Sequence, residues 1–358
     1  MPDQAQGPGE GPAQGQVHDE DERQGRGAAK TAQPKSDWVD ASVSILNAVV
    51  GDYLAQTHND LAIEMGFYQR GEPLGLERES LASAFSNATN RICVFIHGMA
   101  CNETCWSFPG EPSTSYGTLL ERDLNYTPLF LRYNTGLHIS TNGKALAALL
   151  ERILEVYSPP VEELVLVGHS MGGLVLRSAC HYGESFGHRW PTVMRTAFYL
   201  GAPHLGAPLE KIGGALSIAM HAVNEPVVRL VRKVANLRSS GVKDLRHANL
   251  VDEDWAGRDP DTSLRNWRTP VPLKADTQHY VIAGTLAKDA KHLISQLFGD
   301  AMVRLGSATG QPEREDRAPR FPKENLRVLT GINHMNLAHS PDVYREIREG
   351  CGQAVRTT

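Results

Sequence analysis

The chain lacks long apolar runs, is poor in cysteine and carries no excess of basic residues, and each lack excludes a class of protein. No stretch of about 18 consecutive apolar residues occurs, so we expect no membrane-spanning helix. A formal net charge of -5 over 358 residues provides no broad basic field. The composition therefore argues against a nucleic-acid-binding protein.

The five cysteines are an odd number, and Cys93 and Cys180 lie within predicted core elements. This usage fits a reducing compartment better than a framework of disulfides. Cys101 and Cys105 are close enough in sequence to pair or to share a metal, but no second Cys/His pair with zinc-like spacing accompanies them. We therefore interpret both as free loop thiols and expect neither a metal site nor a cofactor.

The first 36 residues are rich in Gly, Gln, Pro and Asp and contain almost no bulky apolar side chains. Such a segment cannot bury enough surface to fold. It also lacks the apolar stretch of a secretion signal. We therefore predict a disordered tail over residues 1–36 and no signal peptide, and we expect a cytoplasmic protein.

The rest of the chain, residues 37–358, is long and apolar enough for one large α/β domain, since 41% of the sequence is hydrophobic. Apolar residues at helical spacing predict helices over residues 38–54 and 144–157. Short apolar runs predict strands over residues 62–68, 91–96, 129–133, 164–167, 196–200, 279–284 and 326–329. Strands that alternate with helices indicate a mostly parallel, doubly wound sheet covered on both faces.

The alternation fails over residues 206–267, where a helical cap inserted above the sheet would lie. Within it, apolar residues from Leu216 to Leu237 recur in steps of four and three, and basic residues lie off this stripe. The pattern fits a helix that packs on the body with a solvated basic face. It also fits a mobile lid whose apolar stripe lines an acyl-binding pocket.

One polar residue interrupts the core pattern in VLVGHSMGGLVL, residues 165–176. Ser170 follows a predicted buried strand and precedes a predicted helix, with Gly168 and Gly172 two positions away on either side. A sharp strand-to-helix turn requires such small neighbours and projects the hydroxyl above the sheet edge. The Met171 amide then lies at a helix N-terminus, where it can donate to an oxyanion. The pattern predicts the nucleophile elbow of an α/β hydrolase.

A serine nucleophile needs a base, and in this fold the chain order is serine, acid, histidine. Of 14 histidines, only His334 and His339 follow the last predicted strand. His334 lies just beyond that strand in GINHMNL, whereas His339 adjoins the final predicted helix. We therefore predict His334 as the base and a surface or capping role for His339.

Two aspartates are candidates for the acid, because both follow the predicted strand HYVIAG. Asp289 lies in AKDAKHL, a mixed-charge stretch typical of an exposed helix. Asp300 is flanked by Phe298 and Gly299 and leads into an apolar segment, as expected of a carboxylate at the rim of a buried site. We predict Asp300 as the acid.

The second oxyanion donor is expected in the loop after the strand ICVFI, which runs into His97, Gly98 and Met99. Gly98 permits a sharp backbone turn, and the Met99 amide follows it. A tight turn alone would explain His-Gly at a strand end. Together with a nucleophile elbow, the segment is better explained as an oxyanion loop.

Five motifs taken together resemble those of bacterial lipase-like α/β hydrolases of the GPI inositol-deacylase-like group: FIHGM, GHSMGG, LGAPHLGAPLE, GDAMV and NHMNL. The resemblance extends from about residue 38 to residue 350 and includes the segment SSGVKDLRHANLVDEDW. Ala301 departs from it, because the family commonly has glycine after the acid.

This resemblance implies a serine carboxylic-ester hydrolase acting on lipids or other acyl esters without a cofactor. It implies Ser170 as nucleophile, Asp300 as acid, His334 as base, and Met99 and Met171 as oxyanion donors. Peripheral contact with lipid is compatible with this assignment. Acyl transfer to an alcohol by the same residues is an alternative, and a catalytically silent hydrolase fold used for binding is another.

Overall fold

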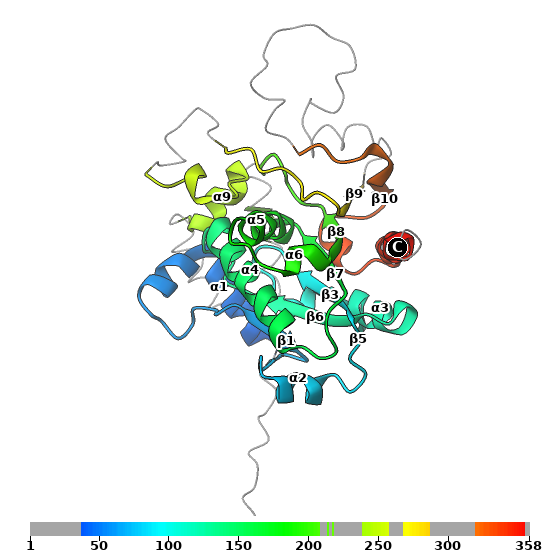
Figure 1. Cartoon of the computed structure of the whole chain (residues 1–358). Helices are drawn as coiled ribbons and strands as arrows, with labels where there is room; N and C mark the ends of the chain where they lie inside the picture. Colours follow the sequence, from blue (N-terminus) through cyan, green and yellow to red (C-terminus); the bar gives the residue numbers. More distant parts are fainter. Residues whose placement is uncertain are drawn as a thin grey trace, which may run out of the picture. The chain divides into compact units, whose positions relative to one another are not determined.

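An eight-stranded sheet organises the residues that the structure describes, which are 37–207, 213–214, 217, 238–257, 268–286 and 319–354 of the computed structural model (Figure 1). The strands are β1 (Gly66–Gln69), β2 (Glu72–Pro73), β3 (Arg91–Ile96), β6 (Thr127–Arg132), β7 (Glu163–His169), β8 (Met194–Leu200), β9 (Gln278–Thr285) and β10 (Leu326–Thr330). Their order across the sheet is β10-β9-β8-β7-β3-β6-β1-β2.

The strands from β10 to β6 are parallel to their neighbours, and β1 and β2 extend the sheet as antiparallel strands at one edge. The predicted mostly parallel sheet is therefore confirmed. The strand predicted over residues 62–68 is shifted, because β1 begins at Gly66 and pairs with β6 in the antiparallel direction. Outside this sheet, β4 (Ser107–Phe108) and β5 (Glu111–Ser115) form a small antiparallel pair.

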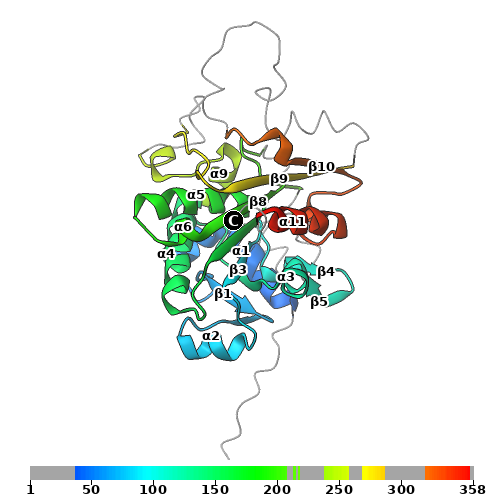
Figure 2. The same ribbon diagram turned by 45° about the vertical axis from the view of Figure 1, so that its right-hand side comes forward.

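Helices cover both faces of the sheet, as predicted (Figure 2). One face packs against α4 (Ile139–Val156) and α5 (Met171–Ser185), and the other against α3 (Tyr116–Leu124) and α11 (Pro341–Ala354). The remaining helical segments are α1 (Asp37–Gln56), α2 (Arg78–Ala84), α6 (Trp190–Val193), α9 (Ser240–His247), η1 (Glu103–Trp106), η3 (Asp252–Asp254), η6 (Lys323–Asn325) and η7 (Met335–Ala338). None of the helices in the described ranges is long and apolar enough to span a membrane.

The central strand β3 explains why its sequence shows no polar alternation. Ile92, Val94 and Ile96 belong to the core beneath α4 and α5. Cys93 and Phe95 belong to the core beneath α3 and α11. Because each face of the strand is covered by helices, every position from Ile92 onward is fully buried and apolar.

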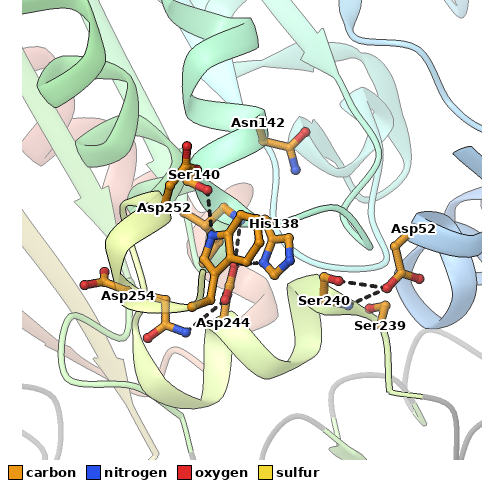
Figure 3. A network of polar contacts seen from close by, with 12 residues as sticks. Asp52, His138, Ser140, Asn142, Ser239, Ser240, Asp244, Asp252 and Asp254 are labelled. Carbon is orange, nitrogen blue, oxygen red and sulfur yellow. Dashed lines mark hydrogen bonds and ion pairs between the residues drawn. The ribbon is translucent and has the colours of Figure 1, made fainter. Parts of the chain in front are cut away.

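The start of α4 differs from its prediction over residues 144–157, because the helix begins at Ile139. The N-cap residue His138 provides no side-chain cap. Instead, the Ile139 amide donates a 2.9 Å hydrogen bond to a carboxylate oxygen of Asp244 in α9. Figure 3 shows Asp244 beside His138, the residue before α4. A contact between residues so far apart in the sequence stabilises the first turn, so local spacing does not reveal it.

Two predicted segments fall wholly or largely outside the described residues. Residues 1–36, the predicted tail, are outside them. So is most of the apolar stripe predicted between Leu216 and Leu237. Of the predicted cap over residues 206–267, the structure describes chiefly α9 and η3, and α9 lies against α1 and α4.

Candidate active site

Ser170 lies on the sharp turn between β7 and α5. Its backbone angles are φ 53° and ψ -121°, which are strained for a residue with a side chain. The turn is fixed by a 2.8 Å hydrogen bond from the Ser170 amide to the Leu200 carbonyl at the end of β8. The predicted strand, turn and helix are all present around this serine, as a nucleophile elbow requires.

The glycines around Ser170 are explained by backbone atoms that pass close to them. A Cβ on Gly172 would lie 2.2 Å from the Ile96 carbonyl oxygen and 2.5 Å from that of His97. A Cβ on Gly168 would lie 2.7 Å from the Gly172 carbonyl oxygen. These neighbours are backbone atoms that cannot turn aside. Glycine at position 172 is therefore needed for the elbow to pack against the end of β3, and glycine at position 168 for the turn itself to close.

Gly172→Ala is expected to lower the free energy of unfolding by about 1 to 3 kcal/mol, because the added methyl overpacks a contact with backbone atoms. Urea denaturation measures this loss. Gly352→Ala in α11 is the matched control, since no atom lies within 4 Å of a Cβ there. The control should be neutral or stabilising by up to about 1 kcal/mol. Equal stability of Gly172→Ala and wild type would contradict the packing argument.

His334 lies next to Ser170, although 164 residues separate the two in the sequence. Its Nε2 atom is 2.9 Å from the Ser170 hydroxyl oxygen, within hydrogen-bond reach. His334 follows β10, whose carboxyl end lies at the same sheet edge as that of β7 because the intervening strands are parallel. His339 does not contact the serine, and its Nδ1 atom lies 3.1 Å from the Cys105 carbonyl oxygen.

His169, which precedes the serine, has a role that the sequence analysis missed. Its Nε2–H donates a 2.9 Å hydrogen bond to the carbonyl oxygen of His334. The ring is buried, and desolvation lowers the pKa of His169 to about 3, so the imidazole stays neutral. This bond ties the loop that carries His334 to the elbow. The only sequence signal for it is the histidine in GHSMGG.

The predicted oxyanion loop follows β3 and passes beside the elbow. A Cβ on Gly98 would lie 3.1 Å from the Ser170 Cβ, so the loop backbone touches the serine. His97 is buried, donates from Nδ1 to the Gly98 carbonyl at 2.9 Å, and accepts from the Tyr133 amide at 3.4 Å. Burial lowers the pKa of His97 to about 4, which favours the neutral ring. Met99 follows in this loop.

Met171, the other predicted oxyanion donor, is the first residue of α5 and is fully buried. Asp300 and Asp289 both fall outside the described residues, which break off at Leu286 after β9 and resume at Pro319. In the described ranges, no group of three or more His, Cys, Asp or Glu side chains is arranged to hold a metal. Cys101 and Cys105 are free thiols.

A family model described as PGAP1-like alpha/beta domain matches residues 87–266, half of the chain. The chain belongs to this family. The PGAP1-like segment contains β3, the predicted oxyanion loop and the elbow, and it confirms the resemblance seen in the sequence motifs. By family and fold, the protein is an α/β hydrolase. The helix α1 precedes the PGAP1-like segment, and His334 follows it.

Solved structures similar to this PGAP1-like protein include a lipase of Bacillus licheniformis in its mature form, with 16% identity, a TM-score of 0.42, and coverage of 74% of this chain and 91% of that one. An esterase of Pyrococcus furiosus has 11% identity and a TM-score of 0.39, with coverage of 76% of this chain and 83% of that one. A lipase-esterase related protein of Clostridium acetobutylicum has 12% identity and a TM-score of 0.36, with coverage of 74% of this chain and 95% of that one. A search of curated proteins found no match.

Proposed function

We propose that this protein hydrolyses carboxylic esters through a covalent acyl intermediate on Ser170. The observation that carries the proposal is the 2.9 Å contact between the Ser170 hydroxyl oxygen and His334 Nε2 at a strained elbow. A hydroxyl becomes a useful nucleophile only when a base within hydrogen-bond reach removes its proton. A protein that only binds ligands has no need of this pair.

In the first half of the reaction, His334 Nε2 takes the Ser170 proton while the hydroxyl oxygen attacks the carbonyl carbon of the ester. The amides of Met99 and Met171 donate hydrogen bonds to the negative oxygen that develops. The tetrahedral intermediate collapses, the alcohol leaves, and His334 returns the proton to it. The acyl group is then attached to Ser170.

In the second half, His334 removes a proton from water, and the resulting nucleophile attacks the acyl-serine. When the second tetrahedral intermediate collapses, the bond to the serine oxygen breaks, His334 Nε2 gives its proton to that oxygen, and the carboxylic acid is released. We assign Asp300 the role of accepting a hydrogen bond from His334 Nδ1, which holds the tautomer that leaves Nε2 free for the serine. Neither half requires a metal or an organic cofactor.

For the substrate, we propose lipid-like acyl esters, with the segment 206–267 as the cap over the acyl chain. The support is the apolar stripe between Leu216 and Leu237, which follows directly on the LGAPHLGAP segment after β8. Peripheral contact with a lipid surface and a cytoplasmic location are parts of the same proposal.

The test incubates the purified protein with acyl esters of short and long chain, with and without added alcohols, and identifies the products. We expect free carboxylic acid as the main product and faster turnover of the longer chains. A transferred ester as the main product would instead support an acyltransferase that uses the same residues. Intact substrate in every reaction, together with no labelling by a fluorophosphonate, would indicate a catalytically silent hydrolase fold.

A further inference from the structure

The predicted oxyanion loop, like the elbow that carries Ser170, contains a strained residue. Ala100, directly after Met99, has a φ of 58° and is buried at 7% exposure. A non-glycine residue holds this left-handed conformation only when its surroundings impose it. The neighbouring turn is closed by a 3.3 Å hydrogen bond from the Cys101 amide to the Gly98 carbonyl. The direction of the Met99 amide therefore depends on what holds Ala100.

Two groups hold Ala100: apolar side chains of α1 pack around it, and the side chain of Thr135 provides its polar contact. The Ala100 amide donates a 3.3 Å hydrogen bond to the Thr135 hydroxyl oxygen. Thr135 lies in the loop between β6 and α4 and is 1% exposed. Because β6 is parallel to β3, this loop lies at the same sheet edge as the oxyanion loop. Because this acceptor is buried from solvent, loss of the hydroxyl would remove the hydrogen-bond partner of the Ala100 amide at a buried position, which is costly.

The Thr135 loop is held between α1 and α9. A Cβ on Gly136 would lie 2.1 Å from the Asn47 carbonyl oxygen in α1, and a Cβ on Gly241 of α9 would lie 2.1 Å from the Thr135 carbonyl oxygen. The Gly241 amide also donates to the Gly136 carbonyl at 3.0 Å. Asn134 donates from its side chain to the backbone of α1 at 2.9 Å. The position of the Thr135 backbone is thus fixed from two sides.

The helix α9 is itself anchored by a network of polar contacts, shown in Figure 3. A carboxylate oxygen of Asp244 accepts from the Ile139 amide at 2.9 Å and lies 2.9 Å from His138 Nδ1. At the first residue of α9, Ser240 donates to Asp52 of α1 from its amide and its hydroxyl, at 2.8 and 2.9 Å. The start of α4, α9 and α1 are therefore held together by polar contacts, and they enclose the loop that carries Thr135.

We propose that Thr135 is a positioning residue for ester hydrolysis: its hydroxyl fixes Ala100 and thereby aims the Met99 amide at the oxyanion. The inference rests on the proposed function. It predicts an effect on the transition state rather than on substrate binding, because the ground-state ester has no oxyanion for this amide to stabilise.

The test compares Thr135→Ser with Thr135→Ala. Both variants lose the γ-methyl group, but only serine keeps the hydroxyl. We expect Thr135→Ala to lower kcat by about 10- to 100-fold, since removal of a whole oxyanion donor costs about 100- to 1,000-fold. KM should stay within about twofold, and Thr135→Ser should retain most of the activity.

A boronic acid inhibitor provides the second readout, because its tetrahedral adduct with Ser170 carries an oxygen in the oxyanion position. Its inhibition constant should rise in Thr135→Ala in proportion to the loss in kcat. Thr196→Val is the control, since Thr196 is fully buried in β8 and its hydroxyl has no partner among the described residues. This control should leave both values unchanged.

Three results would overturn the inference. Equal kcat in the alanine and serine variants would mean that the hydroxyl positions nothing. A rise in KM with unchanged kcat would move Thr135 to substrate binding. A wild-type protein that neither hydrolyses esters nor reacts with a fluorophosphonate would overturn the proposed function, and this inference with it.

Discussion

Replacing Ser170 with alanine is expected to lower kcat by about 10⁴- to 10⁶-fold, because loss of the nucleophile forfeits nearly the whole cooperative rate gain of the catalytic group. The fold should persist. The hydrogen bond to Leu200 is made by the Ser170 amide, which alanine retains, and the hydroxyl lies against His334. Turnover of a chromogenic ester and the thermal midpoint, measured on the same preparation, separate the two effects.

The control for this substitution is Ser185→Ala at the far end of α5. Ser185 is exposed, and its hydroxyl donates only to the His181 carbonyl within the same helix. It should keep full activity and full labelling by a fluorophosphonate probe. The Ser170→Ala protein should not be labelled at all. If the probe still labels it, another residue is the nucleophile and the assignment is wrong.

The second large effect is expected at the acid. Asp300→Asn should lower kcat by about 10⁴-fold, because an amide in place of the carboxylate holds His334 in the wrong tautomer. Both candidate aspartates lie between β9 and β10, in the part of the chain that the structure does not describe. Asp289→Asn is therefore the matched comparison, since it makes the same chemical change in the same connection.

Asp289→Asn should leave kcat within about twofold of wild type, as expected of a surface aspartate. A collapse of kcat in Asp289→Asn, with Asp300→Asn near wild type, would assign the acid to Asp289. Loss of activity in both variants, with lowered thermal midpoints in both, would indicate that the connection is needed for folding rather than for orienting His334.

The strands with covered faces were the most predictable part of the fold. The prediction over residues 91–96 has the same bounds as β3, and the prediction over 164–167 lies within β7, because both are buried on both faces and leave unbroken apolar runs. The antiparallel strands β1 and β2 were less predictable: the strand predicted over residues 62–68 overlaps β1 only in part, and β2 was not predicted. β1 and β2 are short and partly or fully exposed, so they carry no apolar pattern and no sign of their antiparallel direction.

For the candidate site too, some residues could be predicted from the sequence and others could not. Chain order and motif spacing led to Ser170 and His334, which the structure places 2.9 Å apart, while their catalytic roles stay predictions. Thr135 was missed because a single buried threonine has no motif and its significance depends on Ala100, 35 residues earlier. His169 was missed because the partner of its ring is a backbone carbonyl, which leaves no trace in residue identity.

The position of α1 in the chain bears on how the candidate site is assembled during folding. This helix lies before the PGAP1-like segment, residues 87–266, and His334 lies after it. Yet α1 packs against Met99 and Ala100 in the predicted oxyanion loop, and His334 contacts Ser170 in the elbow. Contacts between residues so far apart form only after long stretches of chain have closed, which makes them entropically costly and slow. Ester cleavage would thus be acquired only when both ends of the domain have docked. A fragment cut at the borders of the matched segment would lose the base and part of the support for the oxyanion loop together.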